Sequence, residues 1–228
     1  MKRIILMCGV ILALVVVVGV ILLPNEKLGG EENRIENEQE QKNEQNQKIA
    51  LGSEVFISSI APYIGAFVED GTDEYIENAL SITIENNGSK YIQLMNVAID
   101  EKYVFTVTTL LPGEKMIVLE KSRAKYTEEI NVDNIVVSNI AFFDEEPSLH
   151  EELLEISGED NLITIKNISG EEFSGGKVFY KNKFKDKYIG GITYTGTIPA
   201  LEKDETIMLN SAHYFKDSSE LIFVTYAE

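Results

Sequence analysis

The chain has 228 residues and a formal net charge of −18, from 20 basic and 38 acidic residues. A surface this acidic repels nucleic acid and anionic lipid, because binding either one depends on Lys and Arg side chains that neutralise phosphate. The single cysteine, Cys8, lies in an apolar run, so the rest of the chain has no intrachain disulfide, no thiolate nucleophile and no cysteine-ligated metal.

Residues 4–23 form an uninterrupted apolar run. A helix of this length spans about 30 Å, the thickness of a bilayer's hydrocarbon core, so the run predicts a transmembrane helix. Lys2 and Arg3 precede the run, and the positive-inside bias therefore places residues 24–228 outside the cell. The alternatives are a cleaved signal peptide, which lacks its Ala-x-Ala-like site here, and a lipoprotein, which lacks a small residue before Cys8.

The segment at residues 24–50 is rich in Glu, Asn, Gln and Lys. Such a composition cannot bury enough apolar surface to offset the entropy of the chain, so we expect a disordered polar linker. The linker is a simple spacer in the favoured interpretation. A polar strip that contacts a partner or crosses a wall layer is the alternative.

After residue 50 the sequence changes to short β-branched and aromatic runs separated by turn residues. Leu80, Ile82 and Ile84 alternate with polar residues, a period of two that predicts a half-buried strand. Asn-Asn-Gly-Ser at residues 86–89 predicts a hairpin turn, and Pro112-Gly113 predicts a second turn. We expect about seven short strands, as in an Ig-like sandwich, at residues 54–58, 63–68, 80–85, 91–99, 103–110, 115–120 and 135–143.

Two features of this segment recur in the second half of the chain. Ile-Thr-Ile-Glu-Asn at residues 82–86 returns as Ile-Thr-Ile-Lys-Asn at residues 163–167, and residues 111–117 have a counterpart at residues 201–207. The repeat predicts two tandem sandwiches of the same kind, joined near Pro147. We therefore expect an all-β protein with a transmembrane anchor, a disordered linker and two Ig-like antiparallel β-sandwich domains, at residues 1–23, 24–50, 51–147 and 148–228.

Three segments of the predicted extracellular part, residues 24–228, carry a family resemblance. They are Ile-Ala-Pro-Tyr-Ile-Gly-Ala-Phe-Val-Glu-Asp-Gly (60–71), Leu-Pro-Gly-Glu with Val-Leu-Glu-Lys (111–121) and Tyr-Ile-Gly-Gly-Ile-Thr-Tyr (188–194). In these segments, and over most of residues 53–228, the chain resembles an uncharacterised group of membrane-anchored extracytoplasmic proteins of anaerobic Gram-positive bacteria. The resemblance implies a surface location and tandem Ig-like domains, and it carries over no catalytic residue.

The residues suited to acid–base or metal chemistry are few. The histidines are His150, in the predicted joint, and His213, and neither lies in a pattern that supplies a positioned partner. Asp70 and Asp73, in the acidic segment 69–74, are the candidates for a calcium site. That segment lacks the spacing of an EF-hand loop, so a solvated turn is favoured. We expect no enzyme activity, no cofactor and no metal.

Four lysines stand out in this acidic chain. Lys181, Lys183, Lys185 and Lys187 are spaced by two, so a strand would place all four on one face and turn Tyr180, Phe184 and Tyr188 toward the core. An edge strand protected by lysines is the favoured interpretation. A contact for an anionic wall polymer or protein is the functional alternative.

The tyrosines beside Gly190-Gly191, which are Tyr188, Tyr194 and Tyr214, could form a carbohydrate platform, although core roles are favoured. Together, the patterns predict a single-pass membrane protein whose exterior acts by binding or scaffolding. The alternatives are an accessory subunit of a membrane or cell-wall complex and a small carbohydrate-active enzyme. The sequence identifies no ligand, no small-molecule substrate and no oligomeric state.

Overall fold

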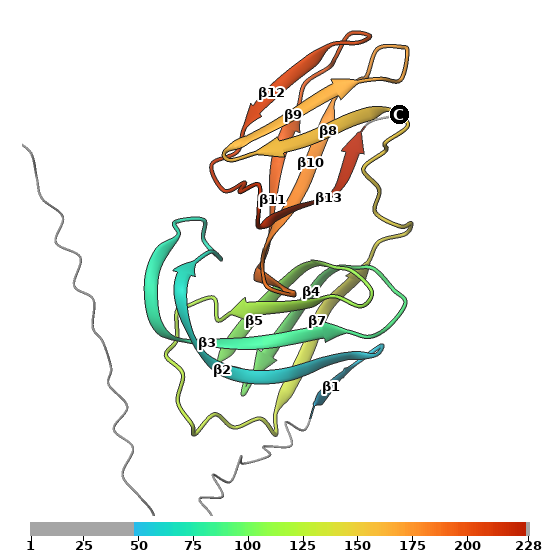
Figure 1. The fold of residues 1–228 in the computed structure, drawn as a ribbon. Helices are drawn as coiled ribbons and strands as arrows, with labels where there is room; N and C mark the ends of the chain where they lie inside the picture. Colours follow the sequence, from blue (N-terminus) through green and yellow to red (C-terminus); the bar gives the residue numbers. More distant parts are fainter. Residues whose placement is uncertain (1–47, 227–228) are drawn as a thin grey trace, which may run out of the picture. The chain divides into compact units, whose positions relative to one another are not determined.

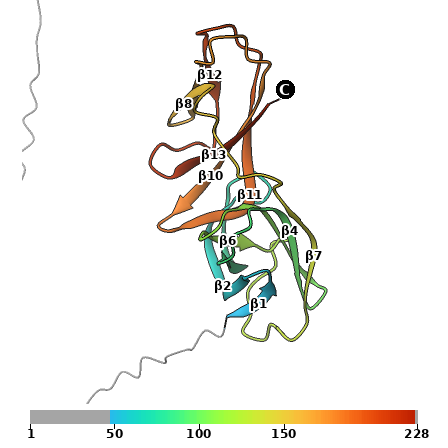
Figure 2. The same cartoon turned by 90° about the vertical axis from the view of Figure 1, so that its right-hand side faces the viewer.

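The computed structural model describes residues 48–226, which form thirteen β-strands and no helix (Figures 1 and 2). The prediction of an all-β protein with sandwich-like packing is confirmed for this part of the chain. Within it, no helix has the length and apolar character needed to cross a membrane. The predicted transmembrane run at residues 4–23 and nearly all of the predicted linker lie outside the described residues.

The strands of the first half of the described chain follow the predicted pattern closely. The five strands expected between residues 80 and 143 are all present, whereas the strands expected at 54–58 and 63–68 form one long strand. An additional strand begins at Ile49, inside the predicted linker. The strands are β1 (Ile49–Gly52), β2 (Val55–Phe67), β3 (Glu74–Asn86), β4 (Ile92–Ile99), β5 (Tyr103–Leu110), β6 (Lys115–Leu119) and β7 (Ile135–Phe142).

These strands form two layers around one hydrophobic core. The antiparallel strands β1-β2-β3-β6 face the three-stranded sheet β5-β4-β7. Ile82 and Ile84 from the first layer and Val97 and Val107 from the second are completely buried in the same cluster. The alternation of apolar and polar residues therefore sets which face of each strand lies in the core.

The predicted hairpin at residues 86–89 is wrong, because β3 and β4 belong to different sheets. The segment between them crosses from one layer to the other. Asn86, 1% exposed, holds this crossing: its Nδ2 donates to the carbonyls of Lys90 and Leu110, at 2.9 and 3.1 Å, and its Oδ1 accepts from the Gly88 N–H. A buried amide that satisfies several backbone groups favours the crossing over a tight hairpin.

The second half of the described chain repeats this arrangement with six strands. The sheet β12-β9-β8 faces β11-β10-β13 (Figure 1) around a second core that contains Ile163, Ile165, Val178 and Leu201. Its strands are β8 (Leu154–Glu159), β9 (Leu162–Asn167), β10 (Gly176–Phe184), β11 (Lys187–Ile198), β12 (Thr206–Asn210) and β13 (Ser219–Tyr226).

Matching contacts relate the two halves strand by strand. Asn167 is completely buried, and its Nδ2 donates to the carbonyls of Glu171 and Leu201 as Asn86 does to those of Lys90 and Leu110. The Asn86 N–H donates to the Glu114 carbonyl, and the Asn167 N–H to that of Glu205. Sheet β2-β3-β6 thus corresponds to β8-β9-β12, and β5-β4-β7 to β11-β10-β13.

A shared sheet connects the two halves. Strand β6 of the first half pairs in parallel with β11 of the second, through Tyr188 with Met116 and Ile189 with Ile117. The result is one seven-stranded sheet, in the order β1-β2-β3-β6-β11-β10-β13. Just beyond this pairing, Gly190 and Gly191 pass so close to the first half that a Cβ would lie 2.3 Å from Val68 Cγ2 or 1.7 Å from the Thr106 carbonyl oxygen, respectively.

The close approach at Gly191 makes a testable prediction. Gly191→Ala should lower the free energy of unfolding by at least about 2 kcal/mol, because the methyl group collides with backbone that cannot move without shifting β5. Gly196→Ala in the same strand is the matched control, since its Cβ would lie 3.2 Å or more from its neighbours. Urea unfolding followed by circular dichroism measures both. Equal stability of the two variants would show that β11 is not held against Thr106.

Candidate functional site

The lysine strand differs from its prediction in two respects. Strand β10 is not an edge strand, because it lies between β11 and β13. Lys181 is only 1% exposed, so the expectation that all four lysines share an outer face is wrong for this residue. A bulge lies beside Lys181: Tyr180 pairs with Tyr194 and Asn182 with Ile189, which leaves residues 190–193 of β11 opposite Lys181 alone.

The bulge is held by polar groups from both halves of the chain. Lys181 Nζ donates to the carbonyl of Ile192 and lies 3.5 Å from that of Gly191. Glu69 Oε1, from the segment after β2, accepts the N–H groups of Gly191 and Leu119, both at 2.9 Å. The Gly191 carbonyl also accepts from Thr108 Oγ1 at 2.7 Å. These side chains satisfy backbone groups that the bulge removes from regular pairing.

Burial shifts the pKa of both Lys181 and Glu69. The pKa of Lys181 falls to about 7, because burial disfavours its charged form more strongly than the nearby Glu69 carboxylate favours it. Burial raises the pKa of Glu69, against the effect of its backbone hydrogen bonds and of Lys181. A buried lysine with a pKa near neutrality makes the stability of this contact dependent on pH.

The other predicted contact lysines lie where the β10–β11 hairpin ends. Lys183 pairs with Glu220 at 2.5 Å and Glu114 at 3.4 Å, and Lys187 lies 4.0 Å from Asp186. Lys185 lies in the turn beside Phe184, which is 61% exposed and does not point into the core. Contact of Lys183, Lys185 and Lys187 with an anionic partner stays a prediction.

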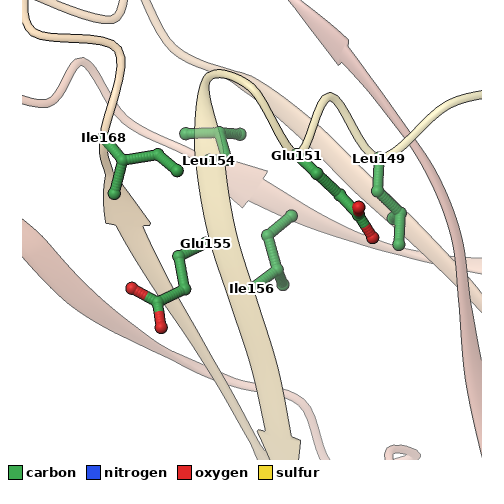
Figure 3. A pocket seen from close by; sticks show the side chains of 6 residues that line it. All are labelled: Leu149, Glu151, Leu154, Glu155, Ile156 and Ile168. Carbon is green, nitrogen blue, oxygen red and sulfur yellow. The ribbon is translucent and has the colours of Figure 1, made fainter.

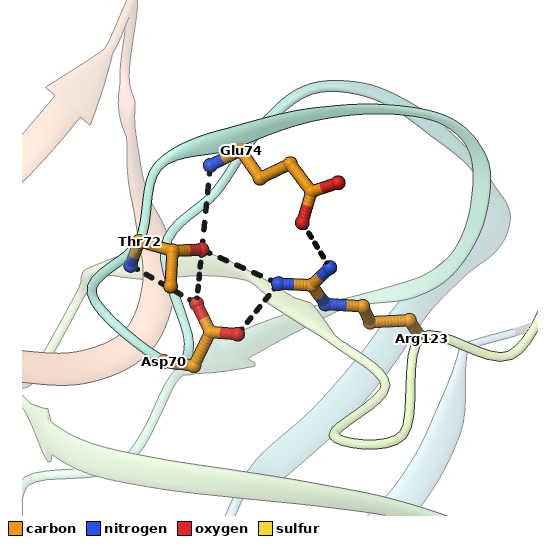
Figure 4. A network of polar contacts seen from close by, with 4 residues as sticks. All are labelled: Asp70, Thr72, Glu74 and Arg123. Carbon is orange, nitrogen blue, oxygen red and sulfur yellow. Dashed lines mark hydrogen bonds and ion pairs between the residues drawn. The ribbon is translucent and has the colours of Figure 1, made fainter.

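The acidic segment 69–74 forms a network around an arginine (Figure 4). Asp70 accepts from the N–H and Oγ1 of Thr72, at 3.0 and 2.7 Å, and from Arg123 at 2.6 Å; Arg123 also pairs with Glu74. The Thr72 hydrogen bonds, with those of Arg123, lower the pKa of Asp70 to about 2. Within residues 48–226, no three His, Cys, Asp or Glu side chains are grouped to hold a metal ion.

Asp73, the second calcium candidate, pairs with His213 of the second half. His213 Nδ1 lies 2.8 Å from Asp73 Oδ2, and the imidazole stacks on Tyr194 with ring centroids 4.8 Å apart. These contacts tie the loop after β2 to the second half of the chain. His150 lies elsewhere, with its ring perpendicular to that of Tyr226 and its Nδ1 3.2 Å from Glu152 Oε1.

The three tyrosines considered as a carbohydrate platform do not form one. Tyr188 is completely buried and Tyr214 is 5% exposed. Tyr194 is half-buried and stacks on Tyr180 at 5.2 Å, and burial raises the pKa of its hydroxyl. Their side chains build the core and the contact between the two halves, as the favoured interpretation held.

An aromatic groove lies where the two halves meet. Val178 and Tyr180 point into the second core, so Phe179 between them points out of it. Phe179 pairs across the strands with Phe223 of β13, and their rings stack at 4.2 Å. Phe143, directly after β7, meets Phe223 edge-on at 5.2 Å.

The groove has a volume of about 530 Å³ and an uncharged lining. Four threonines and Gln93 line the groove together with the three phenylalanines, and Thr108 Oγ1 lies 2.8 Å from Thr193 Oγ1. A volume of about 300–1,000 Å³, apolar rings and a few polar groups are the usual properties of a small-ligand site. The lining residues are Gln93, Thr108, Thr109, Phe143, Phe179, Ile192, Thr193, Phe223 and Thr225.

A second pocket is smaller and belongs to the second half alone. It has a volume of about 240 Å³ and lies beside β8, lined by Leu149, Glu151, Leu154, Glu155, Ile156 and Ile168 (Figure 3). Its volume is below the range of about 300–1,000 Å³ that is usual for ligand sites. A further pocket, of about 380 Å³ beside Phe173, has Glu171 and Glu172 in its lining. The aromatic groove is larger than both and has an uncharged lining, so we take it as the candidate functional site.

Sequence reasoning did not find the groove. Phe179 and Phe223 come from different strands and Phe143 follows a third, and the alternation in β10 shows only that Phe179 faces away from Val178. Protein-family models, curated protein sequences and solved structures were compared with the chain, and none of them matches it. The resemblance to extracytoplasmic proteins of anaerobic Gram-positive bacteria therefore stays a prediction.

The buried Lys181 predicts an unusual pH dependence. In the unfolded chain a lysine keeps its proton up to about pH 10.4, whereas folded Lys181 loses it near pH 7. The unfolded state therefore binds more protons between these values, and the free energy of unfolding should rise with pH by up to about 1.4 kcal/mol per unit. Below pH 7 both states hold the proton and this contribution is constant.

Urea unfolding of residues 24–228 at pH 7, 8 and 9 measures the effect. Lys181→Met should remove the rise between pH 7 and 9, because the lysine whose folded pKa lies near 7 is gone. Lys183→Met, at a half-buried, ion-paired position of the same strand, is the matched control and should keep it. A wild-type stability that stays level across this range would contradict a neutral, buried Lys181.

Proposed function

We propose that this protein is anchored in the cell membrane by residues 4–23, with residues 24–228 extracytoplasmic, and that it acts by binding without catalytic activity. In this proposal, two tandem Ig-like sandwiches, at residues 51–147 and 148–228, stand on a disordered linker at residues 24–50. The apolar run after Lys2 and Arg3 supports the anchor and its orientation. The matching contacts of Asn86 and Asn167 support the tandem arrangement.

The observation that carries the binding proposal is the uncharged aromatic groove. In a chain with 38 acidic residues, none of the lining residues is charged. A charged ligand would have no opposite charge to meet there, whereas an uncharged one loses little on leaving water. The ligand we propose is therefore a neutral molecule with an apolar ring or chain, which packs on Phe143, Phe179 and Phe223, and with hydrogen-bonding groups at its edge.

Noncatalytic binding is favoured over an enzyme by the contacts of the titratable groups. The partner of His213 is Asp73, and the partner of Asp70 is Arg123, so these groups join segments of the fold. Lys181 and Glu69 satisfy backbone groups of the bulge. None of these six side chains lines the groove.

The proposed topology makes a prediction for intact cells. Because Lys2 and Arg3 should stay in the cytoplasm, protease added outside the cells should digest residues 24–228 and leave the apolar run in the membrane fraction. Immunoblotting with antibodies to the second half measures the loss of signal, and a cytoplasmic protein serves as control for cell integrity. Protection of residues 24–228 would contradict the orientation, and release of a chain that begins near residue 25 would contradict the anchor.

The groove predicts binding of an uncharged apolar probe. Residues 24–228 should bind the neutral dye Nile red, and Thr225→Glu should weaken binding about tenfold, because the ligand would desolvate the new carboxylate at the groove's edge. Ser138→Glu, which adds the same charge at an exposed position of β7 outside the lining, should bind as the wild type does. Fluorescence titration measures all three. Equal binding by the two variants would show that the dye occupies another surface.

A further inference from the structure

The correspondence between the two halves reveals an unoccupied sheet edge. Strand β12 corresponds to β6, because Lys115 of β6 pairs with Glu85 and Thr206 of β12 pairs with Lys166. The outer edge of β6 is occupied by β11, and the Leu119 N–H at its end donates to Glu69. Strand β12 ends its sheet, and within residues 48–226 no strand pairs with its outer edge.

The backbone of β12 presents hydrogen-bonding groups at this edge. The Asn167 N–H donates to the Glu205 carbonyl, and the Ser211 N–H to that of Asn161. The alternation of an antiparallel ladder then turns the N–H and C=O groups of Ile207 and Leu209 toward β9. Those of Thr206, Met208 and Asn210 point away from β9 and are free to pair with another strand.

The side chains of β12 lack the usual protection of an edge. Natural edge strands carry charges, prolines or bulges that prevent pairing with other chains. Strand β12, Thr-Ile-Met-Leu-Asn, has none of these, and its ladder with β9 is regular over all five residues. Ile207 and Leu209 pack on the second core, while Met208 on the outer face is 68% exposed. At the position of Met208 in the first half, Ile117 packs into a hydrophobic cluster with Phe67 and Val68.

Other sheet edges are closed, irregular or negatively charged. The four-residue strand β1 shifts register against β2 between Ala50 and Gly52. At β5, the Val104 N–H donates to Glu120 and its carbonyl accepts from Lys121. At β13, the Val224 N–H donates to the Ser148 carbonyl. Strand β8 carries Glu155 and Glu159, and β7 shifts register at Asn139, which has a positive φ of 53°. β12 is thus an uncharged and regular edge in an acidic molecule.

We propose that two copies of this chain pair through β12, antiparallel, about a two-fold axis at Met208. The pairing joins two three-stranded sheets into one of six strands and places the two Met208 side chains next to each other. It sets Asp204 and Glu205 opposite Ala212 and Ser211 of the second copy, so the acidic residues that flank β12 do not face each other. Two molecules of charge −18 repel over most of their surface, and an uncharged strand is where they can meet.

The oligomeric state of the full chain tests this proposal. Sedimentation equilibrium in a density-matched detergent should give twice the monomer mass of 25.6 kDa. Met208→Pro should give the monomer mass, because proline removes an N–H that points to the second copy and none that β9 uses. Met208→Thr, which keeps that N–H, should remain dimeric. A monomeric wild type, or a Met208→Pro variant that stays dimeric through another contact, would overturn the proposal.

Disulfide cross-linking tests the register without relying on the stability of the proline variant. With Cys8→Ser as background, Met208→Cys should form a dimer on mild oxidation, because residues at the axis have Cα atoms about 5.5 Å apart, within disulfide range. Thr206→Cys is the matched control: the two copies of position 206 should lie about 14 Å apart, too far to bridge. Equal cross-linking of the two variants, or none at position 208, would overturn the pairing. A wild-type protein that stays monomeric but binds an extended peptide at β12 would overturn self-pairing and assign the edge to another protein.

Discussion

At Gly190 and Gly191 the backbone of β11 passes so close to Val68 and Thr106 that neither position has room for a Cβ atom. This close approach brings the second half of the chain against the first and lets β11 continue the sheet beyond β6. The aromatic groove depends on the same contact, because Ile192 and Thr193 belong to the bulge and face Thr108 across it. The contact between the two halves and the groove therefore depend on the same residues of β11.

The bulge explains why a lysine is buried in an acidic protein. Residues 190–193 leave regular pairing with β10, and their carbonyls would be costly to bury without donors. Lys181 and Thr108 supply donors to the Gly191 and Ile192 carbonyls, while Glu69 accepts the Gly191 N–H. Removing Lys181 from water costs free energy, and this burial lowers its pKa. These side chains thus satisfy the backbone of the bulge, and Lys181 makes the stability of the contact between the two halves depend on pH.

The sequence predicts what is local and misses what is not. Alternation at residues 80–85 and 103–110 locates β3 and β5, because the side chains of a strand must match the two faces of its sheet. Which sheet a strand joins depends on distant partners, so the Asn-Gly signal at residues 86–89 indicates a turn but not the crossing that Asn86 holds. The period of two does not predict that Lys181 is buried, because the bulge that its amine contacts arises in β11.

The groove escapes prediction for the same reason, since Phe143, Phe179 and Phe223 meet only after three strands are placed. A signal for it exists in the distribution of charge. Strands β4, β5 and β7 contain no charged residue, although a quarter of the chain is charged. Gln93, Thr108 and Thr109 extend this uncharged sheet into the groove.

Strand β12 shows the same property at a different place in the fold. Its counterpart β6 carries Lys115 and is covered by β11 and Glu69, so its pairing is satisfied within the chain. Strand β12 has neither a charged residue nor, within the described residues, a neighbouring strand at its outer edge, and Met208 is exposed whereas the corresponding Ile117 is packed. In a protein with this much negative charge, an uncharged exposed strand costs solubility. A contact that covers the strand would offset that cost, which is why the free edge of the repeat points to an interface.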